Sequence, residues 1–334
     1  MNLVQQAVQQ GGKLSPLIIP AEVTGGTGLL NPSVFIDDDG DILCILRHIN
    51  YTLYHSENDQ RFPSIWGPLS YLHPEEDQHL RTTNYFCRLD ENFNIINYCK
   101  IEMLNLHEPI WEFVGLEDAR LVKWNGKYYG TGVRRDTTTH GEGRMELSEL
   151  EIDKEAWTAK EVSRIRIPAP IDQRAYCEKN WMPILDKPYH YVKWSAPTEI
   201  VKTYPYRPEK CEQVAVVEGI TPPVDLRGGS QLIKWGEMYI ALTHEVVLSK
   251  NYMGQKDGVY RHRLCVWNKA FRLIGISPTE WSFLDAKIEF VCGAAVYKED
   301  LLLSFGYQDN AAFLLQVPKQ LVDSMIEEAL FGGN

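Results

Sequence analysis

The feature that most constrains this chain is a strand–turn–strand unit that occurs five times. In each unit a short apolar strand meets a polar turn, and a second apolar or aromatic strand follows. The turns centre near residues 39, 125, 186, 236 and 299. The spacing leaves room for a further pair of strands after each unit. The units span residues 32–49, 119–133, 180–194, 230–246 and 293–308.

Five weakly similar β units in one chain favour radial repetition. Propellers repeat blades of four strands, so the pattern predicts an all-β fold, a five-bladed β-propeller. Helical periodicity is concentrated in the tail, between Pro318 and Gly332, which predicts a C-terminal helix over residues 318–331. We expect a single domain over residues 1–334, with residues 1–20 as an N-terminal extension. The apolar stripe of the helix is Leu321, Met325, Ile326 and Leu330.

The composition restricts the compartment and the partners. Apolar content of 44% and charged content of 24% are typical of a globular protein. The net charge of −11 argues against a nucleic-acid partner. The start of the chain lacks a signal-peptide pattern, and no apolar run reaches the length of a membrane span. With 7 scattered Cys and no CxxC pair, these features predict a cytoplasmic protein with free thiols.

Polar side chains gather beside the five hairpins. In a propeller the innermost strands line a central channel, so polar residues at the starts of these strands would converge there. Carboxylates and cations together in one channel would suit a sugar or a phosphate group. The candidates are Asn31, Arg47, Glu117, Asp118, Arg120, Arg134, Arg135, Lys179, Asn180, Trp181, Asp225, Arg227, Gln231, His244, Tyr260, Arg263 and Asp309.

These residue types match the needs of glycoside cleavage. A carboxylic acid donates a proton to the leaving oxygen, and an inverting hydrolase needs a second carboxylate about 6.5–9.5 Å away to activate water. A phosphorylase replaces the water by phosphate and needs cations to hold it. Structural roles stay open at this point: an ion pair of Asp118 with Arg120, a core histidine at His244, and turn residues at Lys179 and Asp309. No metal or nucleotide motif occurs, so we expect no metal and no cofactor.

Several segments resemble glycoside hydrolase family 130, the β-mannoside phosphorylases, and related β-mannosyltransferases. GLEDARLVKWNGKYYGTG (residues 115–132) is similar to the strand-and-turn element of that family with the motif EDPR. Four more segments match in order, namely residues 30–47, 177–194, 228–246 and 288–315, and the last of them contains Asp309. The resemblance covers residues 30 to 315 as scattered motifs and implies a five-bladed propeller. Ala119 stands where the family has Pro, and Asn180-Trp181 and RGGSQ (residues 227–231) also depart from its pattern, so the substrate does not transfer.

The resemblance implies a role for each candidate. Asp118 would be the general acid, acting directly or through a substrate hydroxyl. Asp309 would hold hydroxyls of the sugar at the cleavage point. The other substrate-binding candidates are Asn31, Glu117, Arg120, Asn180 and Trp181. The phosphate-binding candidates are Arg47, Arg134, Lys179, His244, Tyr260 and Arg263.

The leading hypothesis is an inverting, metal-independent enzyme that transfers a glycosyl unit, mannosyl by resemblance, between a β-glycoside and phosphate or another acceptor. Its partners would be an oligosaccharide or glycoside and inorganic phosphate or a sugar phosphate. The alternatives are a glycosyltransferase that builds a polysaccharide from an activated sugar, an inverting hydrolase, and a non-catalytic propeller that binds sugar or protein. Homo-oligomer formation stays open. We also expect Arg120 to bind Glu117, the substrate or another acid, because pairing with Asp118 would lower the pKa of a proton donor.

Overall fold

The computed structural model describes residues 2–55, 69–72, 77, 79–170, 176–250 and 256–332. Within these residues the chain is mostly β-structure, in five antiparallel groups of strands. The first two groups are β2 (Leu29–Ile36), β3 (Ile42–Ile49), β6 (Leu80–Leu89) and β7 (Ile95–Glu102), then β9 (Glu117–Trp124), β10 (Lys127–Arg134), β11 (Arg144–Asp153) and β12 (Thr158–Arg166). The third is β13 (Met182–Pro183), β14 (His190–Ser195), β15 (Thr198–Thr203) and β16 (Cys211–Val217).

The fourth group has two short inner strands, which both pair with β19. It consists of β17 (Arg227–Gly228), β18 (Ile233–Trp235), β19 (Met238–Lys250), β20 (Lys256–Trp267) and β21 (Leu273–Ile276). The fifth group runs in the order β22 (Glu289–Tyr297), β23 (Asp300–Tyr307), β24 (Ala311–Val317) and β1 (Lys13–Pro16). Two smaller pairings are β4 (Thr52–His55) with β5 (Leu69–Leu72) and β8 (Phe113–Val114) with β6. In addition, β7 and β12 pair in parallel and join the first two groups at their outer strands.

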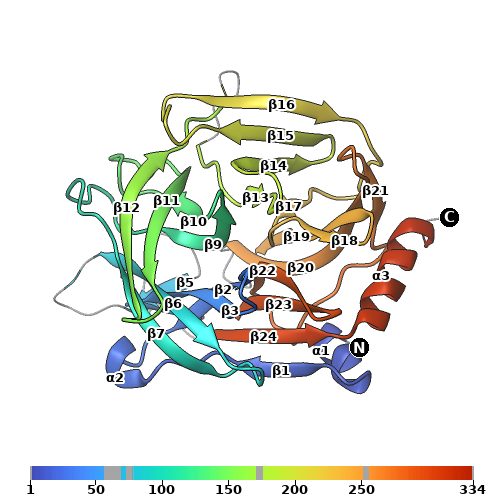
Figure 1. Cartoon of the computed structure of the whole chain (residues 1–334), viewed down its shortest axis with the longest axis horizontal. Helices are drawn as coiled ribbons and strands as arrows, with labels where there is room; N and C mark the ends of the chain where they lie inside the picture. The colour runs from blue at the N-terminus through green and yellow to red at the C-terminus, as the bar shows by residue number, and fades with distance from the viewer. Residues whose placement is uncertain are drawn as a thin grey trace.

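The five groups lie around a common centre (Figure 1). The first strand of each group is nearest the centre, and β7, β12, β16 and β1 lie at the periphery. The five predicted hairpins are confirmed, because β2–β3, β9–β10, β13–β14, β18–β19 and β22–β23 all pair antiparallel. The polar residues beside these hairpins are therefore brought toward the centre from five separate stretches of sequence.

The N-terminal residues differ from the expected extension. β1 pairs along its whole length with β24. The fifth group therefore combines three strands from the end of the chain with one strand from its start. α1 (Leu3–Gln9) carries a capping box at Asn2, and its buried residues pack in one core cluster with those of α3 (Lys319–Phe331). α2 (Ala21–Thr24) follows β1. A four-residue strand ending in proline gives too weak an alternation to be recognised from sequence.

The C-terminal helix is confirmed. α3 buries Leu321, Val322, Ile326 and Ala329 against the fourth and fifth groups. In the described part of the chain, no helix has the length and apolar character needed to cross a membrane.

Four outer strands share a β-bulge, although two of them, β7 and β12, also pair with each other in parallel. Strands β7, β12, β16 and β21 each contain one extra residue opposite the neighbouring strand, which forms a β-bulge. A bulge twists an edge strand and interrupts the row of groups that another chain could pair with. In each case the extra residue is β-branched and apolar: Ile96, Val162, Val214 and Ile274. This recurrence shows that the groups are structural repeats, although their sequences are dissimilar.

Gln231 connects the groups near the centre. Its Nε2 donates to Ser33 Oγ at 2.9 Å and to the Leu121 carbonyl at 3.2 Å, and its Oε1 accepts from the Ala294 amide at 2.9 Å. These partners lie on β2, β9 and β22, and Gln231 itself is fully buried just before β18. One side chain therefore joins four of the five groups.

Replacing Gln231 with Leu is expected to lower the free energy of unfolding by about 2–3 kcal/mol, because the buried Ala294 amide loses its acceptor and Ser33 loses a donor. Urea denaturation monitored by tryptophan fluorescence would measure the change. Gln316→Leu is the control, since Gln316 is only part-buried and its side chain bonds Asp300 at the rim. An equal effect of the two substitutions would contradict the role of Gln231.

Candidate active site

Four of the predicted site residues have an unusual backbone conformation. Asn31, Asp118, Asn180 and Asp309 have positive φ angles of 44°, 51°, 60° and 48°. Non-glycine residues seldom adopt this conformation, and it tends to occur where the surrounding structure holds a functional side chain in place. Asn31 and Asp118 both lie at a β-bulge of the innermost strand of their group. The bulge turns each side chain out of the regular alternation of the strand.

Arg47 holds the two carboxylates that follow Leu116. Its Nη1 donates to Asp118 Oδ1 at 2.8 Å, and its Nη2 lies 3.3 Å from Glu117 Oε2. Asn31 Nδ2 donates to the same Asp118 oxygen at 2.7 Å. The side chains of Glu117 and Asp118 are 17% and 15% exposed, whereas Arg47 is 7% exposed. The two carboxylates are thus partly exposed to solvent, and the more deeply buried Arg47 pairs with both of them.

The environment separates the pKa values of two carboxyl groups. Burial alone would raise the pKa of Asp118, but Arg47, then Arg120, and the hydrogen bond from Asn31 bring it below the ordinary value. Burial is the main cause that raises the pKa of Asp309 to about 6. Repulsion by the Asp118 and Glu117 carboxylates raises it further, whereas Arg47 acts in the opposite direction. In the free protein Asp118 is therefore ionised, and Asp309 carries a proton at mildly acidic pH.

Cations gather beside these carboxylates. Lys179 precedes β13, and Arg227 on β17 pairs in register with His244 on β19. Both cations are exposed, and among the described residues neither makes an ion pair or a side-chain hydrogen bond. Lys179 acts electrostatically on Asp118, Asp309 and His244, so it lies near all three. An anion could therefore bind here without displacing a carboxylate from either cation.

His244 is buried and neutral. Burial first, and then the neighbouring His262 and Lys179, lower the pKa of His244 well below its ordinary value. Its ring stacks on Tyr260, with 5.6 Å between the ring centroids, and meets the edge of Phe290. His244 Nδ1 has no hydrogen-bond partner within the described structure. This nitrogen and the Tyr260 hydroxyl are neutral groups that could hydrogen-bond an anion held by Lys179 and Arg227.

Arg120 does not take the partner that the sequence suggested. It is fully buried, and its Nε and Nη2 donate to the Gly229 carbonyl at 3.1 and 2.8 Å. Its Nη1 donates to the backbone carbonyl of Asp118 at 2.8 Å, and Asn180 Oδ1 lies 3.5 Å from its Nη2. Arg120 therefore fixes the backbone of Asp118 to the fourth group. Arg120 does not pair with the carboxylate of Asp118, as expected, but Arg47 does, and this pairing lowers the pKa of that carboxyl.

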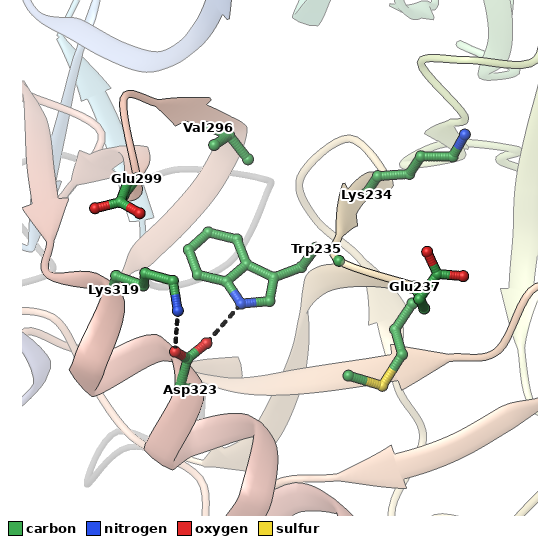
Figure 2. Close-up of a pocket in the computed structure, with 9 residues that line it drawn as sticks. Lys234, Trp235, Glu237, Val296, Glu299, Lys319 and Asp323 are labelled. Atoms are coloured by element: carbon green, nitrogen blue, oxygen red, sulfur yellow. Dashed lines mark hydrogen bonds and ion pairs between the residues drawn. The ribbon is translucent and has the colours of Figure 1, made fainter.

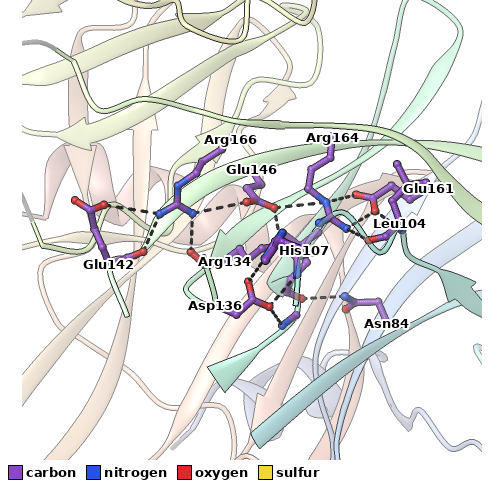
Figure 3. Close-up of polar contacts among 12 residues, drawn as sticks. Asn84, Leu104, His107, Arg134, Asp136, Glu142, Glu146, Glu161, Arg164 and Arg166 are labelled. Atoms are coloured by element: carbon purple, nitrogen blue, oxygen red, sulfur yellow. Dashed lines mark hydrogen bonds and ion pairs between the residues drawn. The ribbon is translucent and has the colours of Figure 1, made fainter. Parts of the chain in front are cut away.

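Arg47, predicted to bind phosphate, pairs with Asp118 and Glu117 instead, and two further predicted phosphate ligands also have other partners. Arg134 is 2.7 Å from Glu146 and 3.2 Å from Asp136, inside a buried network that continues through Arg164 and Arg166 (Figure 3). Arg263 is buried against Glu245 at 2.7 Å and also donates to two backbone carbonyls. Because both guanidinium groups are buried and paired with carboxylates, we correct both residues to structural roles.

The network of Arg134 still supports the site. Asp136 Oδ2 accepts a hydrogen bond from the Gly115 amide at 2.9 Å, two residues before Glu117.

Trp181 is also corrected from substrate binding to the core: it is 1% exposed, and its Nε1 donates to Glu178 at 3.1 Å. Within the described ranges, no group of three or more His, Cys, Asp or Glu residues is placed to hold a metal ion.

A pocket of about 390 Å³ lies elsewhere on the molecule (Figure 2). Trp235, Val296 and Asp323 line it, and the Trp235 Nε1 donates to Asp323 at 2.8 Å. Val296 is at the turn end of β22, whereas the site is at the opposite end of that strand, near Glu289. The pocket is therefore separate from the carboxylates and cations described above.

Sequence reasoning listed Arg227 among the candidates without giving it a role, and it did not single out Tyr51. Arg227 was visible as one of the polar residues around the fourth hairpin, but its register with His244 depends on the pairing of β17 and β19. Tyr51 accepts a hydrogen bond from Arg47 at 3.4 Å. It follows β3 and carries no motif that would have singled it out.

No family model matches the sequence, and no curated protein sequence matches it. Solved structures are similar. A β-1,2-mannobiose phosphorylase from Listeria innocua, in complex with β-1,2-mannobiose, has a TM-score of 0.56 at 15% identity, over 94% of this chain and 96% of that one.

Two further structures extend the comparison to other activities. A GH130 structure described with hydrolases that target β-1,2-mannosidic linkages in Candida mannan has a TM-score of 0.54 at 13% identity, over 88% of this chain and 85% of that one. MPT-1, a GDP-Man-dependent mannosyltransferase from Leishmania mexicana, has a TM-score of 0.50 at 12% identity, over 94% and 93%. Over nearly its whole length, the chain therefore has the fold of GH130 mannoside phosphorylases, related hydrolases and this mannosyltransferase.

Proposed function

We propose that the protein is a single-domain, five-bladed β-propeller that transfers a mannosyl unit between a β-mannoside and phosphate, with inversion at the anomeric carbon. The structural neighbours support a carbohydrate-active enzyme that acts on mannosides. The observation that carries phosphate as the second substrate is the pair Lys179 and Arg227. Both are exposed cations near His244 that make no ion pair in the described part of the chain, and Lys179 is also near Asp118.

The chemistry requires one proton and one anion. The bond between the anomeric carbon and the leaving oxygen breaks, a phosphate oxygen bonds to that carbon from the opposite face, and the leaving oxygen receives a proton. We assign the proton to Asp118, directly or through a substrate hydroxyl. Phosphate bound by Lys179 and Arg227 would offset the cations that lower the pKa of Asp118, so its carboxyl would gain a proton as the site fills. Asp309 would hold the sugar.

Two other activities use the same groups differently. A transferase would place the diphosphate of an activated sugar on Lys179 and Arg227, and MPT-1 gives this alternative a structural precedent. A hydrolase would have no use for the two exposed cations, which disfavours it. The convergence of charged residues from all five groups disfavours a purely non-catalytic propeller.

The test is a panel of β-mannosides incubated with and without inorganic phosphate, together with synthesis from mannose 1-phosphate or from GDP-mannose. Phosphate-dependent release of mannose 1-phosphate, and the reverse synthesis, are expected. Hydrolysis that does not depend on phosphate would favour the hydrolase, and synthesis from GDP-mannose alone would favour the transferase. Failure of the protein to bind or convert any β-mannoside would reject the proposal.

Lys179→Ala and Arg227→Ala are each expected to weaken phosphate binding by about 1.5–3 kcal/mol, the usual worth of a hydrogen bond to a charged group. Isothermal titration calorimetry with inorganic phosphate would measure the loss. Lys298→Ala is the control, because Lys298 is an exposed lysine in the turn between β22 and β23, at the other end of those strands. Unchanged affinity in both site variants would remove the phosphate site.

A further inference from the structure

An exposed aromatic surface lies next to Glu117. Arg135 places its guanidinium 5.3 Å from the ring centroid of Phe113 and 5.9 Å from that of Tyr176. Its Nη2 donates to the Tyr176 hydroxyl at 3.2 Å, and its Nε to the Gly141 carbonyl at 3.1 Å. We name Phe113, Arg135 and Tyr176 the aromatic shelf.

The shelf is held in place although its outer ring is open to solvent. Tyr176 is 53% exposed, yet its hydroxyl donates to the His140 carbonyl at 2.6 Å. Its backbone carbonyl accepts from the Gly143 amide at 3.1 Å. Phe113 is fixed by the pairing of β8 with β6. A large ring that is both exposed and fixed loses little conformational freedom when a ligand binds to it.

A chain of contacts joins the shelf to the carboxylates. The rings of Phe113 and Tyr51 meet edge to face at 6.5 Å, and Tyr51 bonds Arg47, which pairs with Asp118. On the other side, burial would lower the pKa of Arg135, but the nearby Glu117 carboxylate acts against this and the pKa is raised. The shelf therefore borders the proposed point of cleavage on the side of Glu117.

We propose that the aromatic shelf binds the acceptor-side sugar, the unit that leaves when the β-mannoside is cleaved and attacks in the reverse direction. This inference rests on the proposed function and adds a location for the second sugar. A neutral hexopyranose fits the chemistry, because its apolar face packs against the Tyr176 ring. Its hydroxyls can accept from Arg135 Nη1, which makes no hydrogen bond in the described structure. The Glu117 carboxylate balances the charge of Arg135, so the shelf does not require an anionic sugar.

The experiment compares donor and acceptor kinetics in the synthetic direction. Tyr176→Ala should raise the KM for a mannose or mannobiose acceptor about 10-fold, while the KM for mannose 1-phosphate changes less than 2-fold, as expected when one stacking contact is lost. Tyr176→Phe keeps the ring and should restore most of the acceptor affinity. Tyr206→Ala is the control, since Tyr206 is 82% exposed and lies on the turn between β15 and β16.

The outcomes separate the two proposals. An unchanged acceptor KM in Tyr176→Ala, or an equal rise in both KM values, overturns the shelf while leaving the enzyme. If Tyr176→Ala folds poorly, calorimetric titration of mannobiose into Tyr176→Phe and into the wild type decides the same question. The shelf predicts similar affinities for these two proteins. A loss of affinity of about 10-fold in Tyr176→Phe, as large as the one expected for Tyr176→Ala, overturns stacking. If the wild type binds no β-mannoside, the proposed function fails, and the shelf fails with it.

Discussion

Replacing Asp118 with Asn is expected to reduce turnover of a β-mannoside by about 10²–10⁴-fold, the usual contribution of a general acid. The amide has the shape of the carboxyl group but cannot supply the proton. Its oxygen can still accept from Asn31 and Arg47, and Arg47 keeps Glu117 at 3.3 Å. The loss should therefore lie in kcat, with only a modest decrease in stability. Initial rates with saturating phosphate, and the melting temperature of the same preparation, would measure both.

Asp186→Asn provides the matched control. Asp186 is a carboxylate in a turn, where it accepts from the Tyr239 hydroxyl at 2.8 Å and pairs with Lys234. Its replacement should leave turnover unchanged. If Asp118→Asn were fully active, or if it unfolded, then Asp118 would be a structural residue and the proton would have to come from elsewhere. Asp309, whose pKa is raised to about 6, would be the next group to test.

Features that depend on neighbouring residues could be predicted from the sequence. The five hairpins and α3 follow from alternation, turn residues and helical periodicity within about 15 residues, and all of them are found. The closing strand β1 could not be found in this way, because its partner β24 lies about 300 residues away and its four residues carry little pattern. Its place in the fifth group depends on the complete fold.

The site was predictable as a set of positions, but the partner of each side chain was not. Arg47, Arg134 and Arg263 were all candidates beside predicted hairpins. The structure places Arg134 next to Glu146 on β11, and Arg263 next to Glu245 on β19, and these carboxylates neutralise them. Arg120 looked available to an acid, but the Gly229 carbonyl lies within reach only because the second and fourth groups meet at the centre. Residue type and spacing therefore indicated the positions of the candidate site, whereas burial and partners decided which of its cations stay available.

The raised pKa of Asp309 implies that this residue costs stability. Its pKa of about 6 in the folded protein exceeds the ordinary value of 3.8. Between these two values the folded state binds more protons than the unfolded state, so the free energy of unfolding falls as the pH rises. The penalty is absent below about pH 4 and complete above about pH 7. Such a cost is common for groups retained for function rather than for folding.

Asp309→Asn is therefore expected to stabilise the protein at pH 8 by on the order of 1–3 kcal/mol, with the gain disappearing toward pH 4. The same substitution should lower kcat/KM by about 10–150-fold, because a charged acceptor for the sugar hydroxyls is lost. Urea denaturation of both proteins at several pH values, with kinetics at pH 7, would measure the two effects.

Asp118→Asn serves as the control of opposite sign. The pKa of Asp118 is lowered, so its carboxylate stabilises the fold above its ordinary pKa, and that contribution is lost as the pH falls. An Asp309→Asn protein that is less stable than the wild type at pH 8, or a difference that does not vary with pH, would show that the pKa of Asp309 is not raised and that its carboxylate is well stabilised in the fold. Burial, together with the repulsion by Asp118 and Glu117, would then be too weak to raise the pKa of Asp309.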